Sequence, residues 1–207
     1  MTDQSQKKED SESQRAATGI RVRPMVATDA ALLSAMHQRL SPESIYYRYL
    51  QQRKPTLAEI AAVCALDPAS GGGFVAVAPG DAAIVGVAYY VREAQDLEPT
   101  AEPGILIEDR FQEQGIGRQL WQTLQHQAQQ DGLRWLRVLY HPQNRRLARL
   151  VQGGGFPYVA KTNGNLSEYW VDLSKPLADS AAGWVNRLRR ALLLDPWCTL
   201  ADLSAWN

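Results

Sequence analysis

The chain has 207 residues, of which 45% are hydrophobic and 21% are charged, and its formal net charge at pH 7 is zero. This composition fits a soluble globular protein with one domain plus tails, and the balanced charge gives no indication of a nucleic-acid partner. Cys64 and Cys198 lack metal-ligand spacing, so we expect reduced thiols, no metal site and a cytoplasmic location. No apolar run approaches the roughly 20 residues of a membrane span, and the N-terminus lacks the apolar segment of a secretory signal.

The first third of the chain predicts a disordered tail, one strand and three helices. Residues 1–18 are polar and cannot bury enough surface to offset their ordering entropy. Thr28 is the expected N-cap of the first helix, and Ser41 caps the second, with Pro42 in its first turn. The expected elements are a strand at 20–22 and helices at about 28–40, 41–50 and 56–66.

The rest of the domain predicts strands interrupted by two helices. The longer helix is the clearest, because apolar residues recur at helical spacing from Ile116 to Ala128 and the pattern ends at Asp131-Gly132. Glycines 71–73 lead into the first of these strands. Strands are expected at 74–77, 84–91, 101–107, 133–140, 156–159 and 168–171, and helices at 116–130 and 144–151. One α/β sheet covered by helices on both faces accounts for this order.

The turn before the long helix contains Gly115 and Gly117, where the first helical N–H groups have no intrahelical partner. With the helix dipole, they form a potential phosphate site. A P-loop would need Lys-Ser or Lys-Thr after the second glycine, where Arg118-Gln119 stand, and a Rossmann fingerprint would need a small residue where Leu120 stands. From these residues alone, a phosphate-binding turn and a plain tight connection both remain open.

The pattern Gln112-x-x-Gly115-x-Gly117 resembles the pyrophosphate loop of the GNAT acetyltransferase superfamily, which binds acetyl-CoA. The later helix resembles that of the family as well, with Asn144, Leu147, Leu150 and Gly155-Phe156. Residues 40–50, LSPESIYYRYL, and the pair Ala101-Glu102 resemble bacterial protein-lysine acetyltransferases of the Pat type. The resemblance implies a GNAT fold over residues 19–173, with one mixed central sheet of about six or seven strands.

The resemblance also implies a set of site residues. Glu102 would be the general base that accepts the amine proton during direct transfer from acetyl-CoA. Main-chain groups of Leu106 or Ile107 would pair with the pantetheine arm and polarise the thioester carbonyl. The remaining implied cofactor contacts are Gln114, Gly115, Ile116, Gly117, Arg118 and Asn144, with no metal. For Glu102, Arg118 and Asn144 the alternatives are a solvated strand-start carboxylate, a solvated arginine and a helix N-cap.

Three departures from the family pattern leave the function open. Glu113 stands where the turn has glycine, Pro103 interrupts the strand after Glu102, and the helix after Asn144 lacks the tyrosine that serves as general acid. Pro103 must occupy an edge or a bulge. The candidates are a lysine acetyltransferase acting on proteins, an acetyltransferase of small amines, and a binding module that has lost its cofactor.

Residues 174–207 form an extension of different character. An amphipathic basic helix is expected at about 181–194, with Trp184 and Leu188 on one face and Arg187 and Arg190 on the other. The helix could pack on its own domain or on a second copy, or dock onto a partner or an anionic membrane surface.

Overall fold

The computed structural model describes residues 19–93 and 98–174. The predicted 1–18 tail and 181–194 helix lie outside the described residues. The strands are β1 Arg21–Pro24, β2 Gly71–Val77, β3 Ile84–Arg92, β4 Thr100–Ile107, β5 Trp135–Tyr140, β6 Tyr158–Asn163 and β7 Leu166–Asp172. The α-helices are α2 Ala30–Gln38, α3 Pro42–Tyr49, α4 Leu57–Cys64, α5 Ile116–Gln130 and α6 Arg145–Gln152, with 3₁₀ turns η1 Ala27–Asp29, η2 Pro79–Asp81 and η3 Asp109–Phe111.

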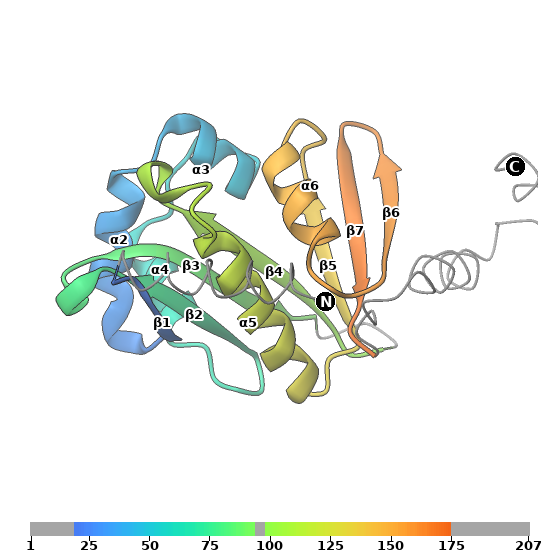
Figure 1. The fold of residues 1–207 in the computed structure, drawn as a ribbon, viewed down its shortest axis with the longest axis horizontal. Helices are drawn as coiled ribbons and strands as arrows, with labels where there is room; N and C mark the ends of the chain where they lie inside the picture. Colours follow the sequence, from blue (N-terminus) through green and yellow to red (C-terminus); the bar gives the residue numbers. More distant parts are fainter. Residues whose placement is uncertain (1–18, 94–97, 175–207) are drawn as a thin grey trace, which may run out of the picture.

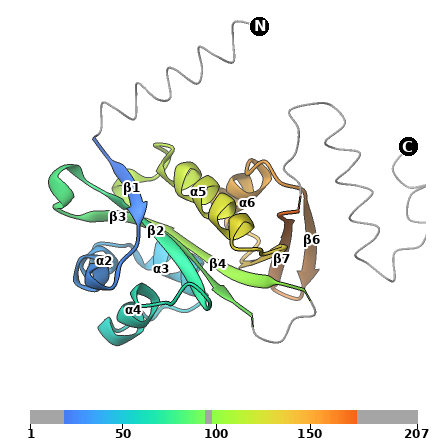
Figure 2. The same ribbon diagram turned by 90° about the horizontal axis from the view of Figure 1, so that it is seen from below.

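The strands form one seven-stranded sheet in the order β1-β2-β3-β4-β5-β7-β6. Neighbours β4 and β5 are parallel, and the other neighbouring pairs are antiparallel. Helices α2, α3 and α4 cover one face, and α5 and α6 cover the other (Figures 1 and 2). The predicted mixed sheet of six or seven strands with helices on both faces is therefore confirmed.

Each face of the sheet has its own apolar core. On one face α5 buries the residues whose spacing predicted it, Ile116, Leu120, Trp121, Leu124 and Ala128. On the other face Leu33 and Met36 of α2 and Ile60 of α4 pack against Val87 of β3 and Leu106 of β4. The side chains of β4 therefore alternate between the two cores, which is the expected period of a strand covered on both faces.

Helix α3 begins as predicted and is fixed to the segment that follows β4. Ser41 Oγ accepts from the Ser44 N–H at 3.2 Å, and Pro42 occupies the first turn. The hydroxyls of Ser41 and Ser44 each donate to the Asp109 carboxylate at 2.7 Å. These bonds hold α3 above the end of β4, where the site is built.

Two local predictions were wrong. Thr28 does not cap α2, because it lies inside η1 and Asp29 is the N-cap residue, without a side-chain cap bond. The Asp29 carboxylate instead pairs with Arg23 at 2.6 Å and accepts from the Val26 N–H at 2.9 Å. Glycines 71–73 do not precede a strand but belong to β2, where main-chain pairing with β3 holds them extended.

Candidate active site

Strands β4 and β5 pair only at their start and then diverge toward α3 and α6 (Figure 1). The paired residues are Thr100 with Trp135 and Ala101 with Leu136, whereas β4 continues to Ile107. In this parallel ladder, the next bond would run from the N–H of residue 103 to the carbonyl of Arg137. Residue 103 is proline and has no N–H. Pro103 therefore ends the ladder, and because the β3–β4 register has no shift, it lies at a local edge and not at a bulge.

The free edge of β4 presents the main chain of Ile105 and the N–H of Ile107, whose carbonyl accepts from Gln112 Nε2 at 3.0 Å. On its other side β4 pairs with β3, where the Glu93 N–H bonds to the Thr100 carbonyl and the Glu108 N–H to the Val85 carbonyl. Bonding alternates along an antiparallel pair, so even-numbered residues face β3 and odd-numbered residues face the opening. Of the two residues predicted to contact the thioester arm, Ile107 directs its N–H to the opening and Leu106 directs its N–H to β3.

The turn between β4 and α5 leaves the N-terminus of α5 without a side-chain cap. Glu113 and Gly115 both have left-handed backbone, with φ of 61° and 82°. Gly115 is the N-cap residue and supplies no side-chain acceptor, whereas α3 and α4 are capped by Ser41 and Thr56. The first amides of α5 and the positive end of its dipole are thus available to an anion.

The opening continues into a cleft of about 430 Å³ between α3, β4, α5, β5 and α6. Its lining contains six predicted residues, Leu106, Ile107, Gly115, Gly117, Arg118 and Asn144. Gln114 is exposed outside the lining, where its Nε2 donates to the Arg110 carbonyl at 2.8 Å, and the Ile116 side chain is buried in the core. Glu102 also lies outside this lining and is exposed.

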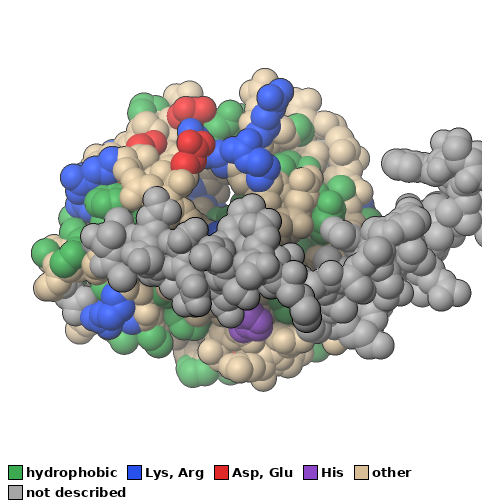
Figure 3. All heavy atoms as spheres, viewed as in Figure 1, with side chains coloured by type: hydrophobic (Ala, Val, Ile, Leu, Met, Phe, Trp, Pro, Cys, Tyr) green, Lys and Arg blue, Asp and Glu red, His purple; other side chains and the backbone are tan. Residues whose placement is uncertain are grey.

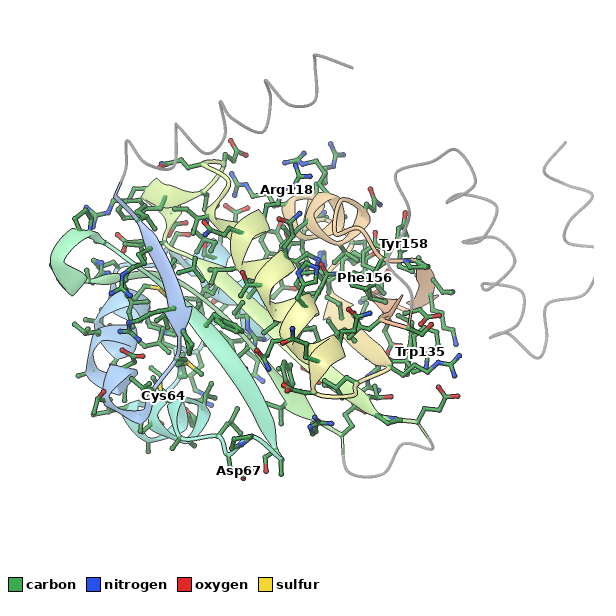
Figure 4. All side chains as sticks on the ribbon, turned by 60° about the horizontal axis from the view of Figure 1, so that its bottom comes forward. Cys64, Asp67, Arg118, Trp135, Phe156 and Tyr158 are labelled. Atoms are coloured by element: carbon green, nitrogen blue, oxygen red, sulfur yellow. The ribbon has the colours of Figure 1, made fainter. Side chains whose placement is uncertain are left out.

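Basic side chains gather at the α5–α6 end of the cleft. Arg118 of α5 and Arg146 and Arg149 of α6 line it and are exposed, and Figure 4 places Arg118 at the start of α5 beside α6. Figure 3 shows a hollow with basic side chains on one side and acidic side chains on the other. The Glu113 carboxylate accepts from Arg146 Nε at 3.3 Å, so this acidic side chain in the turn already has a cationic partner.

Asn144 has one role that the structure shows directly. Its Oδ1 accepts from the Leu147 N–H at 3.1 Å, which makes it the N-cap of α6. The side chain also lines the cleft, and the cap uses only the oxygen. The amide NH₂ remains available to donate to a ligand.

A second cavity, of about 250 Å³, lies on the other face of the sheet between α2, α3, α4 and strands β3 and β4. We call it the helical cavity; its lining includes His37, Arg48, Tyr49, Glu59, Tyr89 and Leu106. Arg48 and Leu106 line both cavities, so the two adjoin there. Even-numbered β4 residues direct their side chains to this face, and Glu102 is therefore on the same face of β4 as the helical cavity.

His37 and Tyr49 form a buried pair at the wall of the helical cavity. His37 Nδ1 bonds to the Leu33 carbonyl at 2.8 Å, and Nε2 bonds to Tyr49 Oη at 2.7 Å. The carbonyl can only accept, so in the neutral ring Nδ1 donates and Nε2 accepts from the tyrosine. Burial lowers the pKa of His37 and raises the pKa of Tyr49 to about 12, so both are uncharged near neutral pH.

Tyr140 ends β5 and His141 follows it, so both precede the helix that lacks the tyrosine general acid. Tyr140 is buried and stacked on Tyr169, with ring centroids 4.6 Å apart, and burial raises its pKa to about 12. His141 is half-buried and lies 5.8 Å from the ring of Tyr46 and 6.2 Å from that of Tyr47. These contacts join the end of β5 to α3 across the opening. His141 therefore contacts Tyr47, which lines the cleft, whereas the ring contact of Tyr140 is with Tyr169.

Comparison with known proteins agrees with this geometry. A family model described as an acetyltransferase (GNAT) domain matches residues 20–157, more than half of the chain. The chain belongs to the GNAT acetyltransferase family. It is therefore an acetyltransferase, with acetyl-CoA as its co-substrate.

Solved GNAT structures share the fold. The GNAT domain of S. lividans PAT has 23% identity, covers 74% of this chain and 90% of that one, and has a TM-score of 0.65. A protein from Salmonella typhimurium, solved with its cofactor acetyl-CoA, has 17% identity, covers 79% of this chain and 99% of that one, and has a TM-score of 0.61. A GNAT-family acetyltransferase from Streptococcus pneumoniae has 20% identity, covers 73% and 96%, and has a TM-score of 0.59. At these identities the likeness shows the fold.

The GNAT domain also contains site residues that sequence reasoning missed. The lining of the 430 Å³ cleft also contains Arg48, Gly104, Trp121, Arg146 and Arg149. Of these residues, only Arg48 could have been suggested by the sequence, because it falls within the Pat-like segment 40–50. Among the residues that the structure describes, no helix has the length and apolar character to cross a bilayer, and no cluster of three or more His, Cys, Asp or Glu could hold a metal.

Proposed function

We propose that this GNAT domain transfers the acetyl group directly from acetyl-CoA to an amine, with Glu102 as general base. The observation that carries the proposal is the free edge of β4, where Ile107 presents its N–H beside the uncapped start of α5. An extended pantetheine arm would add to this edge as a strand does. The pyrophosphate would then meet the α5 amides and Arg118, and the Asn144 amide would donate to the arm.

The reaction needs a base because the acceptor amine must be neutral to attack. A lysine titrates near ~10.4, so roughly one in 10³ is neutral at pH 7, which costs about 4–5 kcal/mol. The amine nitrogen bonds to the thioester carbonyl carbon, the carbon–sulfur bond breaks, and CoA leaves as the thiolate. Glu102, directly or through water, takes the amine proton. The Ile107 N–H stabilises the oxyanion that forms on the carbonyl oxygen.

The acceptor that the sequence favours is a lysine side chain of a protein. Glu102 is exposed, and its cross-strand neighbour Val91 is an exposed apolar residue at 38% of its maximum area. On the β5 side of the opening Leu139 is 39% exposed. Exposed apolar side chains beside Glu102 and in the cleft lining support contact with a protein surface.

A small amine is the second candidate, and the helical cavity favours it. This cavity adjoins the acetyl-CoA cleft at Arg48 and Leu106 on the Glu102 face of β4. Its volume of about 250 Å³ is below the roughly 300–1,000 Å³ of pockets for drug-sized ligands. It therefore suits a single small acceptor or one side chain.

The alternative of a binding module that has lost its cofactor was suggested by departures from the family pattern, and two of these departures, Glu113 and Pro103, do not support it. The Glu113 carboxylate is held by Arg146, so it does not face an anion without a partner. Pro103, which interrupts the strand pattern, accounts for the opening itself.

The proposed function is tested by measuring acetyl-CoA binding and acetyl transfer in Glu102→Gln. We expect calorimetric affinity for acetyl-CoA to stay within about twofold while kcat falls by roughly 10²–10⁴. Glu168→Gln is the matched control, because it removes a carboxylate from β7, which is two strands away from β4 in the sheet and outside the cleft lining. No acetyl-CoA binding by the wild-type chain would overturn the function, and unchanged turnover in Glu102→Gln would exclude Glu102 as base.

A further inference from the structure

The helical cavity offers hydrogen-bond donors and no free carboxylate. Its one acidic lining residue, among those that the structure describes, is Glu59. Both carboxylate oxygens of Glu59 are occupied, by the two terminal nitrogens of Arg53 at 2.8 and 2.9 Å, and by the N–H and hydroxyl of Thr56. An ammonium group that entered the cavity would thus find no unoccupied anion to bind.

Arg48 is the charge in this cavity that has no counter-ion. Within the described residues no carboxylate lies at ion-pair distance from it, although its side chain is only half exposed. Its guanidinium lies 5.0 Å from the ring centre of Tyr49 and 5.1 Å from that of Tyr89, and Nη2 donates to Tyr89 Oη at 2.5 Å. The other guanidinium N–H groups remain to be used, and a planar guanidinium matches a carboxylate in two-point geometry.

Tyr89 adds a second donor beside Arg48. Its oxygen accepts from Arg48, which leaves its own O–H free to donate. Tyr49 differs, because its O–H is already donated to His37. The two donors therefore come from one side of the cavity, and its floor is apolar, formed by Leu33, Val87 and Leu106.

The donors lie close to the expected position of the thioester. Arg48 packs on Gly104, three residues before Ile107, and it lines both cavities. At about 3.3 Å per strand residue, Gly104 and Ile107 are roughly 10 Å apart along β4, with the pyrophosphate turn further on. A carboxylate on Arg48 would hold an amine a few bonds away at the acetyl end of the cleft, distant from the phosphates.

We propose that the helical cavity is the acceptor site, and that it selects a small amine carrying a carboxylate and an apolar side chain, as an apolar α-amino acid does. Arg48 and Tyr89 bind the carboxylate, and the apolar floor takes the side chain. The amine nitrogen bonds to the thioester carbonyl carbon and its proton passes to Glu102, directly or through water, while the carbon–sulfur bond breaks and CoA leaves as the thiolate. This inference rests on the N-acetyltransferase function proposed above and decides between its two acceptor classes.

The test compares acceptors that differ only in the carboxylate. L-leucine and L-phenylalanine are assayed against their carboxamides, with 1,4-diaminobutane and a lysine-containing peptide as the competing classes, using wild-type enzyme and acetyl-CoA. We expect kcat/KM for each acid to exceed that of its carboxamide at least tenfold. The comparison is biased against the proposal, because the amine of a carboxamide is less basic and more of it is neutral.

Variants then assign the preference to the two donors. In Arg48→Gln and in Tyr89→Phe, which keeps the ring, the acid-to-amide ratio should fall several-fold or more, whereas Lys161→Gln on β6 should leave the ratio unchanged. Equal rates on acid and amide, or faster transfer to the peptide or diamine, would overturn the inference and leave the acetyltransferase function standing. If acetyl-CoA binds but no amine in the panel is acetylated, the inference is also overturned, and failure to bind acetyl-CoA overturns the function itself.

Discussion

The guanidinium of Arg48 lies directly on the backbone of Gly104, so that a Cβ at that glycine would be 2.0 Å from Nη2. The contact joins α3 to the free part of β4 at the boundary between the proposed acetyl-CoA cleft and the helical cavity. Glycine is required here for space and not for backbone conformation, because Gly104 does not have positive φ.

Gly104→Ala should displace Arg48 and lower acetyl transfer to carboxylate acceptors. The displaced atoms are the end of a flexible side chain, so the loss of stability should stay within about 1 kcal/mol. A hydrogen bond to a charged group is worth about 1.5–3 kcal/mol, which corresponds to a fall of roughly 10–100-fold in kcat/KM. The measurement is a double-mutant cycle with Arg48→Gln. Additive effects would show that Gly104 and Arg48 act separately.

Pro103→Thr should partly close the cleft. Threonine restores an N–H that can donate to the Arg137 carbonyl and extend the pairing of β4 with β5. We expect slower hydrogen exchange in residues 101–107, a higher melting temperature, and acetyl-CoA affinity reduced at least about tenfold. Pro79→Ala, in the turn after β2, is the control for loss of a proline. Unchanged exchange and affinity would show that Pro103 is not what separates the strands.

Glu113→Gly should strengthen acetyl-CoA binding. Glu113 has φ of 61°, a left-handed conformation that costs a non-glycine residue roughly 1–2 kcal/mol of folding free energy. Glycine avoids this strain but loses about 0.5–1 kcal/mol more chain entropy on folding, so the net effect on stability is small. Removing its carboxylate also removes a like charge beside the pyrophosphate, so affinity should rise several-fold, more at low salt. Arg146→Gln releases the same carboxylate from its partner and should act in the opposite direction. Calorimetry at two salt concentrations measures both, and affinity changes of the same sign would contradict the assignment.

The sequence predicted what depends on local pattern and missed what depends on contacts across the fold. The predicted buried face of α5 and the predicted Ser41 N-cap of α3 were confirmed, because helical periodicity and capping chemistry depend on residues that are close in the sequence. The prediction that Thr28 is the N-cap of the first helix was wrong, because Arg23 pairs with Asp29 and alters the start of the helix. Arg48 was not identified as a site residue because Gly104 and Tyr89, its partners, lie far away in the chain. The opening at Pro103 could not be predicted without the register of β4 against its two neighbouring strands, β3 and β5.

His37 should make stability depend on pH. Burial chiefly lowers its pKa in the folded state from 6.5, with Arg48 and Lys54 contributing repulsion, so the unfolded chain binds more protons below about pH 6.5. The free energy of unfolding should therefore fall as pH is lowered through this range, and recover as pH is raised. Urea denaturation between about pH 5 and 7.5 measures the slope, which should flatten in His37→Gln. An equal slope in the variant would assign the dependence to other groups.

Gly154→Ala should destabilise the fold far more than Gly104→Ala, although both glycines lack space for a Cβ. At Gly154 a Cβ would lie 2.6 Å from Trp121 Nε1 and 2.9 Å from Gln125 Nε2. Both side chains are fully buried, and these polar atoms have no hydrogen-bond partner in the described structure, so nothing nearby can move into solvent. Overpacking of this kind costs about 1–3 kcal/mol.

Urea denaturation of Gly154→Ala, Gly104→Ala and Gly155→Ala separates crowding from backbone strain. At Gly155, where φ is +82° and no atom lies within 4 Å of a Cβ, the cost is strain alone, roughly 1–2 kcal/mol. Gly154→Ala should also weaken acetyl-CoA binding, because Trp121 and the adjacent Gly153 both line the cleft. If Gly154→Ala is as stable as wild type, Trp121 and Gln125 have room to repack, and the floor of the cleft between α5 and α6 is less rigid than its full burial indicates.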